Sequence, residues 1–180
     1  MPKIPINLDN KLILCFYEGN AEKEILDMLM DNDKLIFTKK ELIDEDFQKR
    51  ISVKKVVQKY LKFDYDKDVA IVRVIDSKTE QFKLKKPYNL MYKEIYNCRT
   101  YPEIEYLLIL YHHDEVKFKK ENKKEGLKAC EFCKKYYEYS KAQDKKYFQN
   151  NFNIKDLLST LEKYDMTQPD EHTIYSLVKH

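Results

Sequence analysis

Two continuous apolar runs constrain the fold of this chain more than any other feature. Residues 11–17 (KLILCFY) and 69–75 (VAIVRVI) are apolar almost throughout, and the second run is rich in β-branched residues. Strands of a parallel sheet have this pattern because helices cover the sheet on both faces. We therefore expect two buried parallel strands, each followed by a turn or a charged segment.

The segments around these runs predict an alternation of strands and helices. A turn follows the first strand, and apolar residues then recur with helical spacing from Ala21 to Leu29. We expect a short strand at 35–37, a helix over 44–61, a polar loop over 78–92 that can contain a helical turn, a strand at 94–98 and a helix opening at Pro102. The fold class is therefore α/β: a mostly parallel sheet flanked by helices, with a helical C-terminal region.

The expected domain organisation is one α/β domain over residues 1–113, with residues 114–180 as a helical extension packed on it. The chain has 180 residues, of which 43% are hydrophobic and 36% charged, and this balance is typical of globular proteins. No apolar run approaches the roughly 18 residues that a membrane span requires. The N-terminus also lacks the apolar core of a signal peptide, so we expect a cytoplasmic protein.

A C-x-x-C pair, Cys130 and Cys133, lies inside a helical pattern. A zinc site normally needs four ligands, and no second pair of this kind completes one. His112 and His113 could contribute in space, but they also end a predicted helix, where histidine suits the helix dipole. We interpret the cysteines as ordinary reduced thiols.

Two acidic residues directly follow the two strongest strands: Glu18 after 11–17 and Asp76 after 69–75. Ligands of open α/β sheets bind at the carboxyl ends of the strands, where carboxylates can hold Mg²⁺. Gly19 allows a close approach of the backbone, and Glu22 points back toward the same edge. The alternative is that both charges are simply solvated, since charged residues commonly follow strands.

Three segments resemble the motifs of TOPRIM proteins. Residues 12–22 (LILCFYEGNAE) are similar to the first motif, an apolar strand ending in Glu-Gly with a second acidic residue after it. Residues 72–78 (VRVIDSK) lie where the family has a strand followed by Asp-x-Asp. Residues 97–108 (NCRTYPEIEYLL) are similar to a later signature of RloB-like members. The resemblance spans residues 11–113 and places the chain near the RloB-like and OLD-type nucleases.

The resemblance implies a TOPRIM-like fold and Mg²⁺- or Mn²⁺-dependent cleavage of a phosphodiester in nucleic acid. In RloB-like and OLD-type members such activity is tied to defence against mobile DNA. Glu18 would act as a general acid/base or position the metal, and Asp76 would be a metal ligand. Glu22 and Glu105 would be further acidic groups of the metal site.

The sequence departs from these motifs at two positions. Lys78 stands where the family has its second aspartate, and Glu80 could replace that ligand if the loop bends back. Leu107 stands where the later signature has a tryptophan. The alternative function is therefore a TOPRIM-like fold without catalytic activity, acting as a protein-interaction or nucleic-acid-binding module.

A basic segment interleaved with aromatic residues follows the second strong strand. Such segments can neutralise phosphates and stack on bases, although a solvated lysine loop has the same composition. A partner protein or a second copy of the chain is a further expected partner, because tyrosines cluster in the C-terminal helices. The candidates for contacts with DNA or RNA are Lys78, Lys83, Lys85, Lys86 and Arg99.

Overall fold

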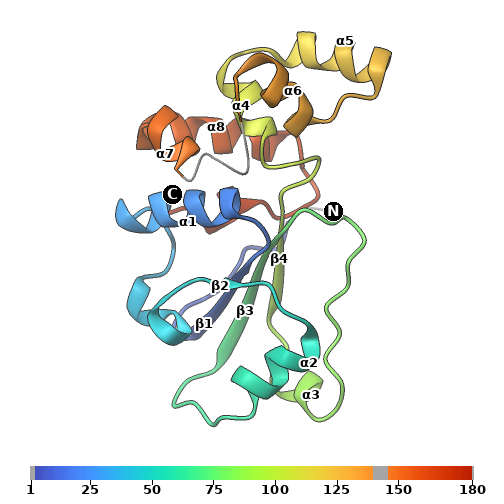
Figure 1. Cartoon of the computed structure of the whole chain (residues 1–180). Helices are drawn as coiled ribbons and strands as arrows, with labels where there is room; N and C mark the ends of the chain where they lie inside the picture. The colour runs from blue at the N-terminus through green and yellow to red at the C-terminus, as the bar shows by residue number, and fades with distance from the viewer. Residues whose placement is uncertain (1–2, 140–145, 180) are drawn as a thin grey trace.

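A computed structural model describes residues 3–139 and 146–179. In this part of the chain, four strands form one all-parallel sheet in the order β2-β1-β3-β4 (Figure 1). The strands are β1 (Leu12–Tyr17), β2 (Gln48–Lys49), β3 (Val69–Ile75) and β4 (Ile95–Arg99). The α/β fold class and both strong strands are thus confirmed.

The central pair β1 and β3 is in register from Leu12 opposite Val69 to Tyr17 opposite Val74. Residues of β3 are buried on both faces of the sheet. One face contributes to a large core that also contains the C-terminal helices, and the other face packs in a smaller core with residues 53–92. Both strands are apolar because helices cover the sheet on both faces.

The helices lie on opposite sides of this sheet (Figure 1). The smaller core is covered by α2 (Val53–Val56), its continuation η3 (Val57–Leu61) and α3 (Tyr88–Met91). Short turns form at η1 (Lys39–Glu41), η2 (Ile43–Glu45) and η4 (Ile174–Leu177). The large core is covered by α1 (Asn20–Asp31), α4 (Tyr106–Tyr111), α5 (Glu115–Glu125), α6 (Ala129–Tyr136), α7 (Tyr147–Asn151) and α8 (Ile154–Met166).

Three expected elements differ in the structure, two of them before β3. Residues 35–37 form no regular strand: Leu35 makes one antiparallel bridge to Val178, and the buried apolar side chains of this segment pack in the core instead. The expected helix over 44–61 begins only at Val53, after the β2 strand. The backbone at Asp44 and Glu45 has positive φ angles of 61° and 51°, which a continuous helix does not allow.

The helix expected to open at Pro102 begins at Tyr106. The preceding turn consists of hydrogen bonds between residues three apart, from the N–H of Tyr106 to the carbonyl of Glu103 (3.0 Å) and from that of Leu107 to Ile104 (3.1 Å). This tighter turn carries Ile104 into the core before the α-helix starts. The prediction was therefore correct for the helix and wrong for its first residue.

Cys130, Cys133 and His112 make packing and hydrogen-bond contacts in the helical region. Cys130 and Cys133 are buried on α6, and the Cys133 thiol donates a hydrogen bond to the carbonyl of Glu105 at 3.4 Å. Burial raises the pKa of the Cys133 thiol, which keeps it protonated. The His112 ring packs on Tyr137 with ring centroids 4.3 Å apart.

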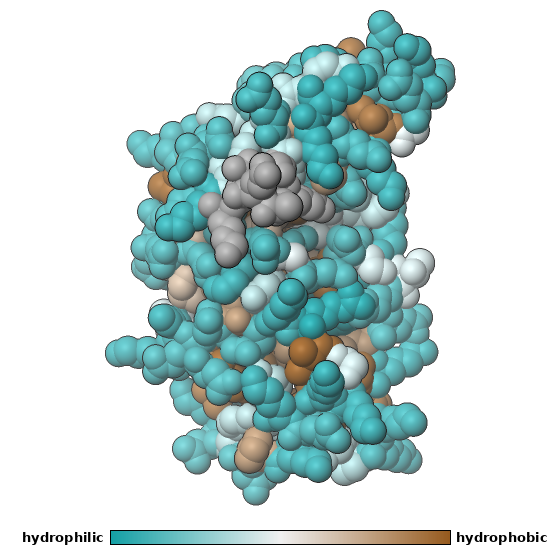
Figure 2. All heavy atoms as spheres, viewed as in Figure 1, coloured by the Kyte–Doolittle hydropathy of each residue, from teal (hydrophilic) through white to brown (hydrophobic). Residues whose placement is uncertain are grey.

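The surface seen in Figure 2 is mainly hydrophilic, and its hydrophobic residues form several small groups. Among the described residues, none of the helices combines the length and the apolar content that a membrane span requires. The hydrophobic residues are concentrated in the two cores on either side of the sheet.

The shared core predicts that the C-terminal helices and the sheet unfold together. Leu107 on α4 is fully buried in that core, whereas Val116 on α5 is 83% exposed. We expect Leu107→Ala to lower the free energy of unfolding by about 2–5 kcal/mol, because it leaves a cavity. Val116→Ala should change it by no more than about 0.5 kcal/mol. Urea denaturation measures both, and equal small effects would contradict a shared core.

Candidate functional site

The carboxyl ends of the parallel strands meet at one edge of the sheet, where β1 leads directly into α1. Gly19 precedes the helix with an extended backbone, and its N–H donates a hydrogen bond to Glu22 Oε2 at 3.1 Å. A Cβ atom at Gly19 would lie 2.7 Å from that same oxygen. The close approach that glycine allows here is therefore used by the Glu22 carboxylate.

Glu18 and Asp76 come together at this edge. The backbone N–H of Asp76 donates a hydrogen bond to Glu18 Oε2 at 3.2 Å. Burial raises the pKa of the Glu18 carboxyl, the hydrogen bond from the Asp76 backbone lowers it, and the adjacent Asp76 side chain raises it again. Two carboxylates at the ends of neighbouring parallel strands thus form an acidic pair that favours a nearby cation.

In the structure that cation is Arg50, which directly follows β2. Its N–H donates to the carbonyl of Tyr17 at 2.8 Å, so the residue lies beside the end of β1. One guanidinium nitrogen of Arg50 pairs with Glu18, and the other pairs with Glu80 from the loop after β3. Arg50 therefore links the acidic pair to that loop.

Arg73 is a buried cation within the otherwise apolar strand β3. Its side chain is only 3% exposed and pairs with the second oxygen of Glu80. It also donates a hydrogen bond to Asn97 Oδ1 on β4 at 2.9 Å, and its guanidinium lies 4.7 Å from the ring centroid of Phe82. Glu80, expected as a substitute metal ligand, is thus held by two arginines.

The basic residues expected to contact nucleic acid lie in two places. Arg99, at the end of β4, donates a hydrogen bond to the carbonyl of Ser77, and the Lys78 ammonium lies 3.8 Å from the ring centroid of Tyr101. The loop then runs from the carboxyl end of β3 back along the side of the sheet to α3 (Figure 1). On this stretch the exposed lysines are Lys83, Lys85 and Lys86.

Glu22 and Glu105 lie on the other side of the edge. Glu22 is buried and accepts a hydrogen bond from the hydroxyl of Thr100 at 3.4 Å, and the buried Glu105 accepts one from the Tyr139 hydroxyl at 3.3 Å. Both line a cavity of about 590 Å³ bordered by α1, the turn before α4, and the start of α7. The five expected metal ligands are therefore divided between two places.

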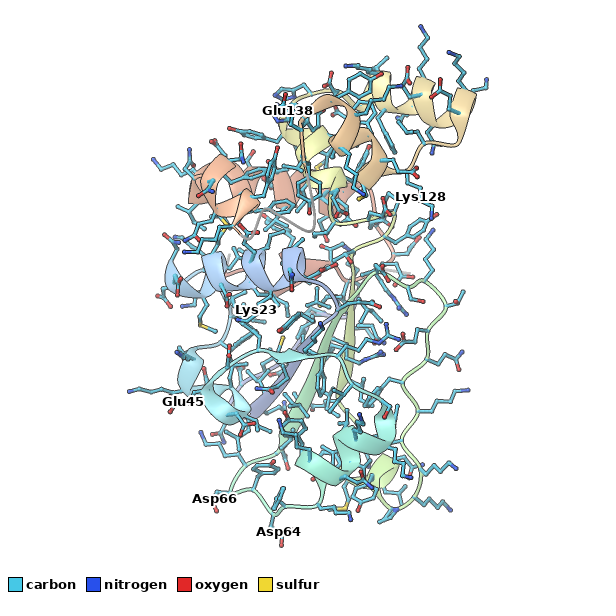
Figure 3. The ribbon with its side chains drawn as sticks, viewed as in Figure 1. Lys23, Glu45, Asp64, Asp66, Lys128 and Glu138 are labelled. Atoms are coloured by element: carbon cyan, nitrogen blue, oxygen red, sulfur yellow. The ribbon has the colours of Figure 1, made fainter. Side chains whose placement is uncertain are left out.

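Within residues 3–139 and 146–179, no three His, Cys, Asp or Glu side chains are grouped closely enough to hold a metal ion between them. The acidic character of the chain is also spread over the surface: Figure 3 shows Asp64 and Asp66 at the end of the sheet opposite α1. The pair formed by Glu18 and Asp76 is distinguished by its place at the carboxyl edge.

Sequence reasoning overlooked Arg50, Arg73 and Asn97. The composition contained a signal for the two arginines, because arginine is rare in this chain: only three of its 34 Lys and Arg residues are arginines. All three arginines lie at this one edge of the sheet, directly after β2, within β3 and at the end of β4. Arginine binds planar oxyanions in a bidentate manner that lysine cannot reproduce.

The raised pKa of Glu18 predicts a pH dependence of stability. The folded protein holds a proton at Glu18 more tightly than the unfolded chain, whose pKa is near 4.5. This contribution is fully present below that pH and is lost as the pH rises through the higher folded value. The stability of Glu18→Gln relative to the wild type should therefore increase from pH 4 to pH 7.

Urea unfolding at a series of pH values measures this difference. Glu94→Gln is the matched control, because Glu94 pairs with Lys11 (3.0 Å) at the opposite end of the sheet. A difference between the wild type and Glu18→Gln that stays constant with pH would contradict the raised pKa.

No protein-family model, curated protein or solved structure matches this chain. The structure itself shows an α/β fold with a four-stranded parallel sheet.

Proposed function

We propose that the chain is a metal-dependent phosphodiesterase acting on nucleic acid, of the TOPRIM type that its motifs resemble. The single observation that carries this proposal is the meeting of Glu18 and Asp76 at the carboxyl ends of β1 and β3. This edge is where open α/β sheets bind their ligands. The two residues come from the two segments that resemble the first and second TOPRIM motifs.

The donor set suits Mg²⁺ or Mn²⁺. Magnesium is commonly held by one or two carboxylates, and it keeps several waters and contacts substrate phosphates for the remaining positions. Glu18 and Asp76 supply two hard oxygen ligands, and the adjacent Asp76 side chain is, after burial, one of the causes of the raised pKa of Glu18. When bound there, a divalent cation would activate a water and neutralise charge on the phosphate.

The chain's own residues would position the substrate and move protons. Glu18 has the raised pKa that suits a general acid/base, and it would take or return a proton at its carboxylate. Arg99 and Lys78 lie at the ends of β4 and β3, beside the acidic pair, where they would contact the phosphodiester backbone. Lys83, Lys85 and Lys86 would extend this contact along the neighbouring loop.

Thermal unfolding in EDTA, Mg²⁺ or Mn²⁺ tests the proposed metal site. A ligand that binds only the folded protein stabilises it by about 2.7 kcal/mol at a hundredfold excess over its Kd. We expect a rise in the midpoint for the wild type that disappears in Asp76→Asn. Asp64→Asn, at the opposite end of the sheet, should keep the rise. A rise of the same size in Asp76→Asn would contradict the assignment.

Cleavage assays with labelled DNA and RNA test the chemistry. We expect Glu18→Gln and Asp76→Asn to lose cleavage while their circular dichroism spectra stay unchanged. Full activity in both variants would rule out this site.

A second candidate is a TOPRIM-like fold that binds nucleic acid or a partner protein without cleavage. Two observations favour it. Lys78 replaces an acidic motif residue and packs on Tyr101. Glu80 pairs with Arg50 and Arg73 instead of joining Glu18 and Asp76 as a third acidic ligand. In that case the metals would not shift the unfolding midpoint. Affinity for nucleic acid, if that is the partner, would fall steeply with added salt.

A further inference from the structure

The carboxylate of Glu80 lies between two guanidinium groups that reach it from different strands. One oxygen pairs with Arg50, which follows β2, and the other pairs with Arg73 on β3. The end of β1, with Glu18, lies between these two strands in the sheet order. Two of the three arginines of the chain thus converge on one oxyanion, immediately beside the proposed catalytic pair.

The Arg73 side chain is held in place by groups other than Glu80. Asn97 on β4 accepts its hydrogen bond at 2.9 Å, and the Phe82 ring lies against the guanidinium. Arg50 is also anchored independently of Glu80, because its backbone N–H donates a hydrogen bond to the carbonyl of Tyr17. The two cations are therefore arranged for an oxyanion by the sheet itself.

We propose that the space between Arg50 and Arg73 is a binding site for a phosphate group of nucleic acid, and that Glu80 fills it as an internal substitute until the substrate arrives. Guanidinium groups bind carboxylate and phosphate oxygens in the same bidentate way. This inference rests on the proposed function for its nucleic-acid ligand. It adds a phosphate site and an autoinhibitory residue to that function.

The exchange keeps the buried charge compensated. Arg73 is almost fully buried, so a state in which it had no anionic partner would carry the large cost of an unpaired buried charge. Replacing the carboxylate of Glu80 by a phosphate leaves a counter-ion beside both arginines throughout. Glu80 itself is a quarter exposed, and it can return to water when it leaves.

Glu80 belongs to a segment that can move without disrupting the sheet. Residues 76–87 form no regular helix or strand, and Ser77 Oγ accepts the Glu80 N–H at 3.1 Å. Leu84, which is buried in the smaller core, anchors the segment farther along. The exposed lysines of this segment follow Glu80 in sequence, so its release would occur beside the proposed nucleic-acid contacts.

Removal of the Glu80 charge should therefore open the phosphate site. When an internal competitor occupies the site, the apparent affinity is the intrinsic affinity multiplied by the fraction of molecules in which the site is free. We expect Glu80→Gln to destabilise the folded protein and to bind nucleic acid about tenfold more tightly. Glu94→Gln removes an ion-paired glutamate at the opposite end of the sheet and is the matched control.

The first experiment is chemical rescue with inorganic phosphate in EDTA, at constant ionic strength against chloride. Phosphate stabilises folded proteins generally, so the wild type and Glu94→Gln define the background. We expect the unfolding midpoint of Glu80→Gln to rise by more than this background. A rise no larger than that of the two controls would overturn the phosphate site.

The second experiment measures binding of a labelled single-stranded oligonucleotide in EDTA by fluorescence anisotropy. We expect Glu80→Gln to bind more tightly than the wild type, and Arg50→Gln, which alters a half-exposed side chain, to bind more weakly. The double variant should lose the gain of Glu80→Gln. Should Glu80→Gln fail to fold, unchanged binding by Arg50→Gln would overturn the proposal.

The two experiments separate the ligand sources and the two proposals. Phosphate rescue without tighter oligonucleotide binding would assign the site to a free phosphate compound and overturn the nucleic-acid ligand. Because both experiments contain EDTA, they do not depend on the metal. If the metals do not shift the unfolding midpoint but phosphate rescues Glu80→Gln, only the phosphodiesterase proposal is contradicted. If the metals shift the midpoint but phosphate does not rescue the variant, only the phosphate site is contradicted.

Discussion

The buried charge of Arg73 is the constraint on which the edge of this sheet depends. Burial lowers the pKa of its guanidinium, and the neighbouring Glu80 raises it again, but an arginine remains charged at neutral pH in either case. The charge lies within a strand that is otherwise apolar, so an anion must be brought to it. Glu80 supplies that anion, because the loop after β3 passes the edge of the sheet and brings the Glu80 carboxylate to Arg73.

The same edge collects charges of both signs in a small space. Parallel pairing of β1 and β3 brings Glu18 beside Asp76, and the ends of β2 and β4 add Arg50 and Arg99. Ion pairs of this kind contribute little net stability, because desolvation offsets much of their attraction. Their concentration at the ligand-binding edge of a parallel sheet therefore supports a role in binding, as perturbed charges in functional sites commonly do.

The central strands of the sheet could be predicted from the sequence, because apolar runs are local signals. The apolar runs identified β1 and β3, and parallel pairing then required Glu18 and the residue after β3 to meet.

Other features depended on tertiary structure. β2 has two residues and no apolar run, and the contact of Glu80 with two arginines joins segments 30 and 7 residues away. Glu22 and Glu105 line a cavity on the other side, where Thr100 after β4 and Tyr139 after α6 supply their hydrogen-bond partners.

Anomalous diffraction from crystals soaked with Mn²⁺ would show whether the acidic pair at this edge is a metal site. We expect one anomalous peak between the carboxylates of Glu18 and Asp76, within about 2.0–2.5 Å of an oxygen of each. In that state the Arg50 guanidinium should have moved away from Glu18. A fully soaked crystal with no peak there, and with Arg50 still paired to Glu18, would show that the acidic pair is not a metal site.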